Sequence, residues 1–144
     1  MNKQELITSI FQNIDAIEID DIKKIFENKA PGYCYTRVGN PTVTAFENRI
    51  TKLEGGMASI ACASGMAAIM NAILNIVRSG DEIVSSASLY GGSIDLFRDI
   101  EEFGIKTRYV KNNDWEAIEG AINEHTRLLF AETIGNPCLD VTDV

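Results

Sequence analysis

Residues 61–68 read Ala61-Cys62-Ala63-Ser64-Gly65-Met66-Ala67-Ala68. The pattern predicts the end of a short buried strand, a Ser-Gly turn and a long helix, because apolar residues recur at helical spacing after the turn. Ser64 is a good N-cap, and Gly65 lacks a Cβ where the backbone would come close to another group. Since a helix start offers unpaired N–H groups and the positive end of the dipole, we interpret the turn as a phosphate site. The alternative is an ordinary capped helix after a strand, and these eight residues alone favour it.

Composition limits the class of protein. A chain of 144 residues can bury a core, and its net charge of −8 without a Lys/Arg cluster argues against nucleic acid and anionic membrane surfaces as partners. The apolar stretches are too short to span a bilayer, and we see no signal-peptide pattern. Cys34, Cys62 and Cys138 lack zinc-ligand spacing. We therefore expect reduced thiols, no metal site and a cytoplasmic location.

The first 42 residues combine a helical pattern with a turn-rich loop. Apolar residues at spacings of three or four predict one or two amphipathic helices over residues 1–28, broken near Asp20-Asp21. These helices pack either on their own domain or on another subunit, and the sequence leaves both open. In the loop, Tyr35 and Arg37 are candidate binding residues, since a guanidinium suits a phosphate or carboxylate. A solvated loop arginine is the equal alternative.

The remaining chain alternates helices and strands. Asn40 and Pro41 predict a helix start, and Gly55-Gly56 its end. After residue 80 the pattern predicts three strands with helices between them, which is typical of parallel βαβ units. The expected elements are a strand at Ile83–Ser86, a helix capped by Ser93 and closed by Gly104, a strand at Ile105–Val110, a helix capped by Asp114, and a strand at Thr126–Thr133.

Three candidates fall at one edge of this expected sheet. Ligands of parallel sheets bind beyond the carboxyl ends of the strands, and Ser64-Gly65, Tyr90 and Asn136 all follow expected strands. By contrast, we expect His125 to be a surface residue. We also expect the pairs Asp81-Glu82 and Glu101-Glu102 to be solvated charge. No Ser/His/Asp or Cys/His arrangement for nucleophilic catalysis is evident.

Six ordered motifs resemble one family. From about residue 26 to the end, the chain is similar to the Cys/Met-metabolism (trans-sulfuration) enzymes that depend on pyridoxal 5′-phosphate. That family includes O-acetylhomoserine sulfhydrylases, which the chain resembles most, cystathionine γ-synthases, cystathionine lyases and methionine γ-lyases. The motifs are Tyr35-Thr36-Arg37-Val38-Gly39-Asn40-Pro41-Thr42, Leu53-Glu54-Gly55-Gly56, Ala63-Ser64-Gly65-Met66-Ala67-Ala68, Gly80-Asp81-Glu82-Ile83, Leu89-Tyr90-Gly91-Gly92, and Glu132-Thr133 to Asn136-Pro137.

The resemblance implies an α/β fold. Residues 43–144 would form the N-terminal part of the large domain of a fold type I, aspartate aminotransferase-like enzyme. Residues 1–42 would form a helical arm and an inter-subunit loop. The implied activity is γ-replacement or γ-elimination on O-acylated homoserine or sulfur amino acids, so the substrate would be a small amino acid. Gly135 before Asn136-Pro137 resembles the sulfhydrylases more than the lyases.

The resemblance also assigns roles around the cofactor phosphate. Ser64 and the backbone N–H groups of Gly65 and Met66 would hold the phosphate, in agreement with the turn inferred above. Tyr35 and Arg37 would reach the phosphate of a neighbouring subunit's cofactor. The active site would then be shared within a homo-oligomer, a dimer or tetramer.

Two further residues would contact the cofactor ring. Tyr90 would stack on the pyridine ring, and Asn136 would hydrogen-bond the phenolic oxygen. A ring suits a ring and an amide donor suits a phenolate.

The sequence departs from the family in what it lacks. Family members run more than twice this length, and no lysine here lies in the Ser-x-Thr-Lys setting of the Schiff-base lysine. The aspartate for the pyridinium nitrogen and the arginine for the substrate carboxylate are also missing. We therefore expect a truncated piece of the enzyme, inactive alone, that binds the cofactor weakly or not at all. A non-catalytic oligomerisation or binding module is the alternative.

The truncation has a consequence for the sheet. In the family, strands that come later in sequence separate the strand before Ser64 from the other three. Without those later strands, that first strand lacks its partner and the sheet has open edges.

Overall fold

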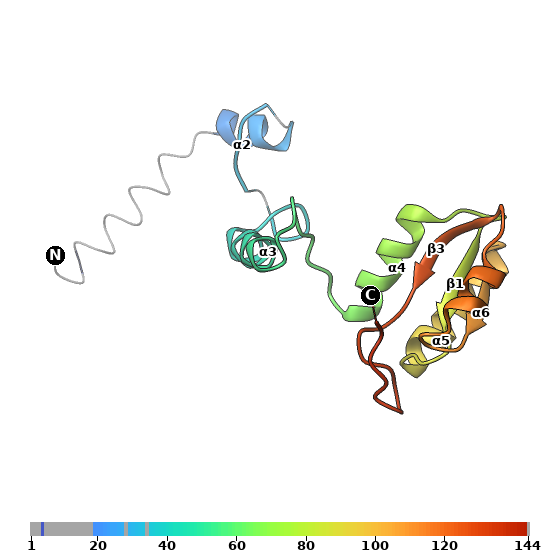
Figure 1. The fold of residues 1–144 in the computed structure, drawn as a ribbon. Coiled ribbons are helices and arrows are strands. Elements are labelled where there is room, and N and C mark those ends of the chain that lie inside the picture. The colour runs from blue at the N-terminus through green and yellow to red at the C-terminus, as the bar shows by residue number, and fades with distance from the viewer. Residues whose placement is uncertain (1–3, 5–18, 28, 34, 144) are drawn as a thin grey trace. The chain divides into compact units, whose positions relative to one another are not determined.

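The computed structural model describes residues 4, 19–27, 29–33 and 35–143. Most of the predicted helix within residues 1–18, and Cys34, lie outside the described residues. The chain divides into two compact units, residues 1–61 and residues 62–144, which we describe separately (Figure 1). The predicted arm of residues 1–42 and large-domain part of residues 43–144 concern an assembled enzyme, and that division stays a prediction.

The first unit contains two helices, α2 (Ile19–Phe26) and α3 (Pro41–Leu53). Helix α2 begins at Ile19 and includes Asp20-Asp21. Because residues 5–18 lie outside the described residues, the predicted break near Asp20-Asp21 stays a prediction. The helical spacing of Ile22 and Phe26 simply extends back to the start of the helix.

Helix α3 begins and ends where the sequence predicts. Asn40 accepts hydrogen bonds from the N–H groups of Thr42 at 2.8 Å and Val43 at 3.4 Å, and Pro41 is the first helical residue. Just past the end, Gly55 has φ +63°, the left-handed conformation that glycine tolerates best.

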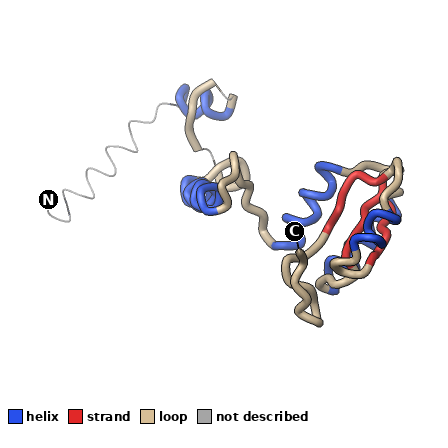
Figure 2. Tube along the Cα trace, in the orientation of Figure 1, coloured by secondary structure: helices blue, strands red, loops and turns tan. Residues whose placement is uncertain are grey.

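The second unit is a three-stranded parallel sheet with helices. Its strand order is β2 (Lys106–Val110), β1 (Glu82–Ser86), β3 (Thr126–Phe130). Figure 2 shows these strands side by side. The helical segments are α4 (Gly65–Ile76), α5 (Gly91–Ile100), the short 3-10 helix η1 (Glu101–Phe103) and α6 (Trp115–Ala121). The predicted βαβ pattern is confirmed.

Helix ends in this unit follow local sequence in three cases. Ser64 and Asp114 accept hydrogen bonds from the N–H groups of Ala67 and Ala117, so both predicted N-caps are confirmed. Gly104, with φ +79°, follows η1 and closes the α5–η1 segment as expected. The predicted N-cap Ser93 is wrong, because it is the third residue of α5 and is fully buried.

Two strand predictions also need correction. Residues 61–63 form no strand, because within the described residues no neighbouring strand supplies the hydrogen bonds that a strand requires. Strand β3 ends at Phe130 rather than Thr133. The chain beyond it turns back on itself, with an antiparallel bridge between Ile134 and Val141.

The core of the second unit lies between α4, α5 and the sheet. Phe97 of α5 is fully buried and meets Phe130 of β3 edge-on, with ring centroids 5.0 Å apart. All five residues of β1 are buried, as expected for a central parallel strand. The buried apolar cluster comprises Ile73, Val77, Ile83, Leu89, Phe97, Ile100 and Ile105. No helix in the described part of the chain is long and apolar enough to cross a membrane.

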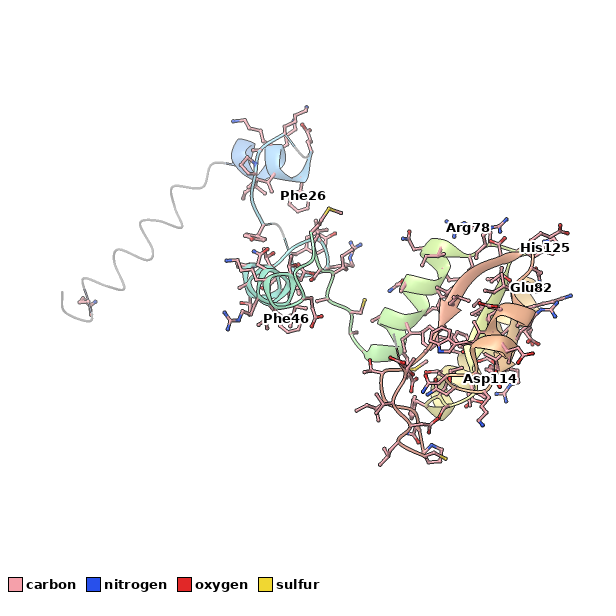
Figure 3. The ribbon with its side chains drawn as sticks, in the orientation of Figure 1. Phe26, Phe46, Arg78, Glu82, Asp114 and His125 are labelled. Carbon is pink, nitrogen blue, oxygen red and sulfur yellow. The ribbon has the colours of Figure 1, made fainter. Side chains whose placement is uncertain are left out.

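Glu82 is buried, so the prediction that it is solvated is wrong. It accepts hydrogen bonds from Arg108 Nε at 2.6 Å and from Asn123 Nδ2 at 2.7 Å. The parallel pairing of β1 with β2 and β3 brings these partners, 26 and 41 residues away, to the end where the strands begin. Figure 3 labels Glu82 there with the exposed His125, as predicted for the histidine. The hydrogen bonds from Arg108, and then Asn123, lower the pKa of Glu82 to about 2.

The other acidic pair behaves differently. Glu101 and Glu102 are exposed, as predicted. Asp81, by contrast, accepts the N–H of Arg78 at 2.7 Å and lies 3.7 Å from Arg127 Nε. Asp81 and Glu82 therefore link the starts of the strands through these contacts, so the prediction that this pair is solvated charge is wrong.

We predict that Glu82→Gln lowers the melting temperature at pH 7. Because folding depresses the pKa of Glu82 from 4.5 to about 2, its stabilising effect is complete above pH 4.5 and is lost as the pH falls toward 2. The difference between variant and wild type should therefore narrow over that interval. Circular-dichroism melts at a series of pH values test this, with the exposed Glu102→Gln as the matched control. A constant difference between the variant and wild type at all pH values would contradict the prediction.

Candidate functional site

The phosphate turn, Ser64-Gly65-Met66, opens α4 as expected. The Ser64 hydroxyl accepts the N–H of Ala67 at 3.1 Å, and its backbone is extended. Within the described residues, the N–H groups of Gly65 and Met66 have no acceptor. A Cβ placed on Gly65 would have no neighbouring atom within 4 Å. Two open donors at a helix start are suited to an anion.

The turn faces the end of the sheet where the strands finish. Helix α4 packs against β3 and α5. Figure 1 shows α4 running opposite to β3, so the first turn of α4 lies toward the carboxyl end of that strand. The loops after β1 and β3 lie at the same end because the strands are parallel. The structure thus places the phosphate turn, Tyr90 and Asn136 at one end of the second unit.

Tyr90 stands directly before α5 with its ring partly covered. The residue is 53% exposed. A Cβ on Gly92 would lie 2.5 Å from Tyr90 Cε1, so the ring rests against the first turn of α5. The ring therefore combines a contact with the helix and an accessible surface, which is the arrangement a stacking platform needs.

Glu132 is the site residue that sequence reasoning missed. Its Oε2 accepts the backbone N–H of Tyr90 at 2.9 Å, and its Oε1 accepts the hydroxyl of Ser93 at 2.8 Å. In the sequence, Glu132 is one of the last residues of a strand pattern, and Ser93 is a candidate helix cap. Nothing local signals that the two meet across 39 residues.

The loop that carries Asn136 packs tightly on the loop after β1. A Cβ on the buried Gly135 would lie 2.3 Å from Ser88 Oγ and 3.0 Å from the Ser88 carbonyl oxygen. Only glycine permits this approach. Asn136 itself is exposed, and its peptide bond to Pro137 is cis. The structure therefore joins the loops of Tyr90 and Asn136 through the residues beside them.

The loop after β2 joins the same assembly. Asn113 Nδ2 donates to the Val141 carbonyl oxygen at 2.8 Å, and the Asp143 N–H donates to Asn113 Oδ1 at 2.9 Å. The Ser88 hydroxyl, with a smaller contribution from Asn112, holds the pKa of Asp140 below its ordinary value. The loops after all three strands are thus connected by hydrogen bonds, which gives the site a common base.

Tyr35 and Arg37 lie in the first unit and pair with each other. The Arg37 guanidinium donates to the Tyr35 hydroxyl, and its central carbon lies 4.9 Å from the centroid of the Tyr35 ring. The Tyr35 ring also stacks on Phe26, with centroids 6.2 Å apart. Both predicted residues are exposed. Their role toward a neighbouring subunit's cofactor stays a prediction.

Comparison with known proteins decides the family. The model of the Cys/Met metabolism PLP-dependent enzymes matches residues 2–144. This chain belongs to that family. It is 44% identical over 128 residues to the O-acetyl-L-homoserine sulfhydrylase of Leptospira meyeri. The matched region covers 88% of this chain and 29% of that protein. It is 38% identical over 120 residues to an L-methionine gamma-lyase of Fusobacterium nucleatum, covering 83% and 30%.

Solved structures of family members show the same fold. A putative O-acetylhomoserine (thiol)-lyase from Campylobacter jejuni, solved with N′-pyridoxyl-lysine-5′-monophosphate, superimposes with a TM-score of 0.76 at 33% identity. The match covers 88% of this chain and 32% of that one. The predicted α/β, fold type I architecture is confirmed. The chain spans about 30% of the length of the relatives it matches.

The residues present fit the family's cofactor. The phosphate of pyridoxal phosphate needs donors and positive potential, which the open amides and dipole of α4 supply. The pyridine ring needs a flat apolar partner, and the half-exposed Tyr90 offers one. An exposed amide such as that of Asn136 can donate to the ring oxygen. The chemistry of the donor set therefore agrees with the family.

We predict that Gly135→Ala destabilises the second unit by about 1–3 kcal/mol, because the new methyl group overlaps Ser88 and must push the two loops apart. Gly120→Ala is the matched control. It lies in α6 with no atom within 4 Å of the new Cβ, so it should stabilise by about 0.5–1 kcal/mol. Urea denaturation measures both changes. Equal stability of Gly135→Ala and wild type would show that the loops are not held as described.

Proposed function

We propose that this chain supplies part of the pyridoxal-phosphate site of an enzyme that acts on O-acylated homoserine or sulfur amino acids. The reaction would be γ-replacement or γ-elimination. The observation that carries the proposal is the open first turn of α4, with the free N–H groups of Gly65 and Met66 at the carboxyl end of the sheet. The two relatives named above, a sulfhydrylase and a γ-lyase, represent the two reaction types.

The phosphate turn would bind and orient the cofactor. The N–H groups of Gly65 and Met66 donate to phosphate oxygens, and the Ser64 cap holds the turn in the geometry that exposes them. The missing Cβ of Gly65 lets the phosphate approach the backbone closely. When bound, pyridoxal phosphate supplies the electron sink for chemistry at the substrate's carbon atoms.

Tyr90 and Asn136 would fix the cofactor ring. Tyr90 covers one face of the pyridine and excludes water from it, while the Asn136 amide donates to the phenolic oxygen. Neither group moves a proton in this role. Both orient the ring.

A sulfhydrylase is the preferred member of the family. The chain is 44% identical to the sulfhydrylase and 38% identical to the γ-lyase named above. Gly135 before Asn136-Pro137, which resembles the sulfhydrylases more than the lyases, points the same way. The substrate would then be an O-acylated homoserine.

We propose that the 144-residue chain is inactive alone. No lysine in it lies in a Ser-x-Thr-Lys setting, so it offers no lysine positioned to bond the cofactor. Its share of the site is phosphate binding and ring orientation. These interactions at a helix start supply on the order of 1 kcal/mol, which is enough for weak, non-covalent binding only.

We predict weak binding of inorganic phosphate and of pyridoxal phosphate at the phosphate turn. In an NMR titration with phosphate, the amide signals of Gly65 and Met66 should shift and saturate only at high concentration. Gly65→Ala should weaken these shifts, because its methyl group occupies the open space at the turn. Gly91→Ala is the matched control, since Gly91 is also the first residue of a helix and has no atom within 4 Å of a new Cβ.

The same samples test inactivity. We expect no turnover of O-acetylhomoserine or methionine, and no borohydride-trapped adduct on a single lysine with pyridoxal phosphate. A stoichiometric adduct on one lysine would overturn the proposal that the chain lacks its attachment site. Unshifted Gly65 and Met66 signals at saturating phosphate would overturn the phosphate turn.

We also propose that the chain assembles as a homo-oligomer, a dimer or tetramer. Helix α3 has no buried residue in the described structure, and its apolar Phe46 and Leu53 are 57% and 64% exposed. Taken by itself, the described part of the first unit thus leaves apolar side chains uncovered, including Met57 and Ile60. A second copy that covers them would remove this area from water.

We predict self-association through the first unit. Sedimentation velocity should show a dimer or larger species, and Phe46→Arg should shift it toward monomer because a charge opposes burial of that surface. Phe103→Arg is the control, since Phe103 is similarly exposed, at 66%, but lies in the second unit. A strict monomer for the wild type at high concentration would contradict the proposal.

A further inference from the structure

We propose that Glu132 is the positioning residue of this site: its carboxylate holds Tyr90 in place and locks the loop of Tyr90 to the loop of Asn136. The inference rests on the proposed function in one respect, since Tyr90 and Asn136 matter to a cofactor only if the chain takes part in binding one. The contacts that carry it belong to the chain itself. Glu132 is named in no role by the sequence pattern.

The carboxylate makes one hydrogen bond to each of two groups on the other loop. Glu132 Oε2 accepts the Tyr90 N–H at 2.9 Å, and Oε1 accepts the Ser93 hydroxyl at 2.8 Å. Ser93 is fully buried, so its hydroxyl needs a partner inside the fold. Two bonds from one carboxylate define both the position and the direction of the segment from Tyr90 to Ser93.

Glu132 also supplies the hydrogen-bond acceptor at the start of α5 that the helix's own sequence lacks. Tyr90 occupies the N-cap position, and no side chain of the helix caps it. In a capping box, an acidic residue three positions on reaches back to the N-cap N–H. Here the residue at that position is Ser93, and the acid comes from the loop after β3, 42 residues beyond Tyr90. The cap is therefore tertiary, and the start of α5 depends on the β3 loop.

The other end of this connection is equally fixed. The Thr142 hydroxyl donates to the Glu132 carbonyl oxygen at 2.6 Å, which holds the backbone of Glu132. Gly135 packs on Ser88, two residues before Tyr90. Glu132 and Gly135 thus make two separate contacts between the loops, one on each side of the segment that leads to Asn136. Tyr90 cannot shift independently of Asn136 while both contacts stand.

The position of the Tyr90 ring follows from its backbone. The ring lies against Gly92, where an added Cβ would come within 2.5 Å of it. The ring reaches this seat only if the Tyr90 backbone keeps the orientation that the Glu132 carboxylate imposes. Loss of the carboxylate should release both the amide and the ring.

The experiment compares Glu132→Ala and Glu132→Gln with wild type and with Glu119→Ala, an exposed glutamate on α6. Amide hydrogen exchange reports the Tyr90 N–H, and nuclear Overhauser effects report the contact between the Tyr90 ring and Gly92. We expect exchange at Tyr90 to accelerate about tenfold or more in Glu132→Ala, the factor that loss of one hydrogen bond to a charged acceptor implies. The ring contact should weaken.

The conservative variant separates positioning from general stability. Glutamine keeps an oxygen for the Tyr90 N–H and an amide that can donate to Ser93, so Glu132→Gln should restore most of the protection and the ring contact. The amides of β1 should stay protected in all variants. If Glu132→Ala unfolds, Ser93→Ala removes one of the two bonds that hold the Glu132 carboxylate, and exchange at Tyr90 should accelerate while the β1 amides stay protected.

Ligand-binding measurements on the same variants distinguish this inference from the proposed function. Pyridoxal phosphate should bind more weakly to Glu132→Ala than to wild type, whereas inorganic phosphate should bind both equally, because the phosphate turn is untouched. Equal loss of both ligands would overturn positioning of the ring. Failure of the wild type to bind either ligand would overturn the proposed function alone, while accelerated exchange at Tyr90 would still support the role of Glu132. Wild-type exchange at Tyr90 in Glu132→Ala would overturn the inference whatever the ligands do.

Discussion

The parallel pairing of β1 with both β2 and β3 is the constraint on which the second unit depends. The central strand is buried along its whole length and hydrogen-bonded on both edges. Since all three strands point the same way, every connection that follows a strand emerges at one end. That single geometric fact gathers Tyr90, Asn136 and the Asn112-Asn113 turn. It gathers Glu82, Arg108 and Asn123 at the other end, where the strands begin.

Two helix starts in this unit solve the same problem in different ways. Both α4 and α5 must satisfy the N–H groups that a first turn leaves without intrahelical partners. Ser64 caps α4 from within, and the Gly65 and Met66 donors stay open. The start of α5 has no side-chain cap from its own sequence, and Glu132, on a distant loop, accepts the N–H of Tyr90 there. The two starts thus differ in where the capping group comes from: α4 takes it from its own sequence, and α5 takes it from another loop.

The two units differ in how well they bury their apolar residues. The second unit has a contiguous core of fully buried side chains around Phe97. Helix α3 of the first unit has no buried residue, although its end caps are well formed. Local sequence can start and stop a helix, but burial requires a partner surface.

The sequence by itself determined the features that depend on neighbours along the chain. Asn40, Ser64 and Asp114 cap their helices because the hydroxyl, amide or carboxylate reaches N–H groups two or three residues on. The order of the motifs along the chain was enough to identify the family. The alternation of strands and helices was enough to predict the parallel sheet. These are short-range patterns, and their physics is complete within a few residues.

Tertiary structure alone decided where long-range partners meet. The sequence predicted a solvated Glu82, but the sheet places Arg108 and Asn123 within hydrogen-bonding distance of its carboxylate. Ser93 looked like a cap until Glu132 took that place. Residues 61–63 have the composition of a strand, yet no strand forms within the described residues, because a strand exists only through hydrogen bonds to a neighbour. In each case the deciding atom lies outside the local sequence, so only the folded chain could supply it.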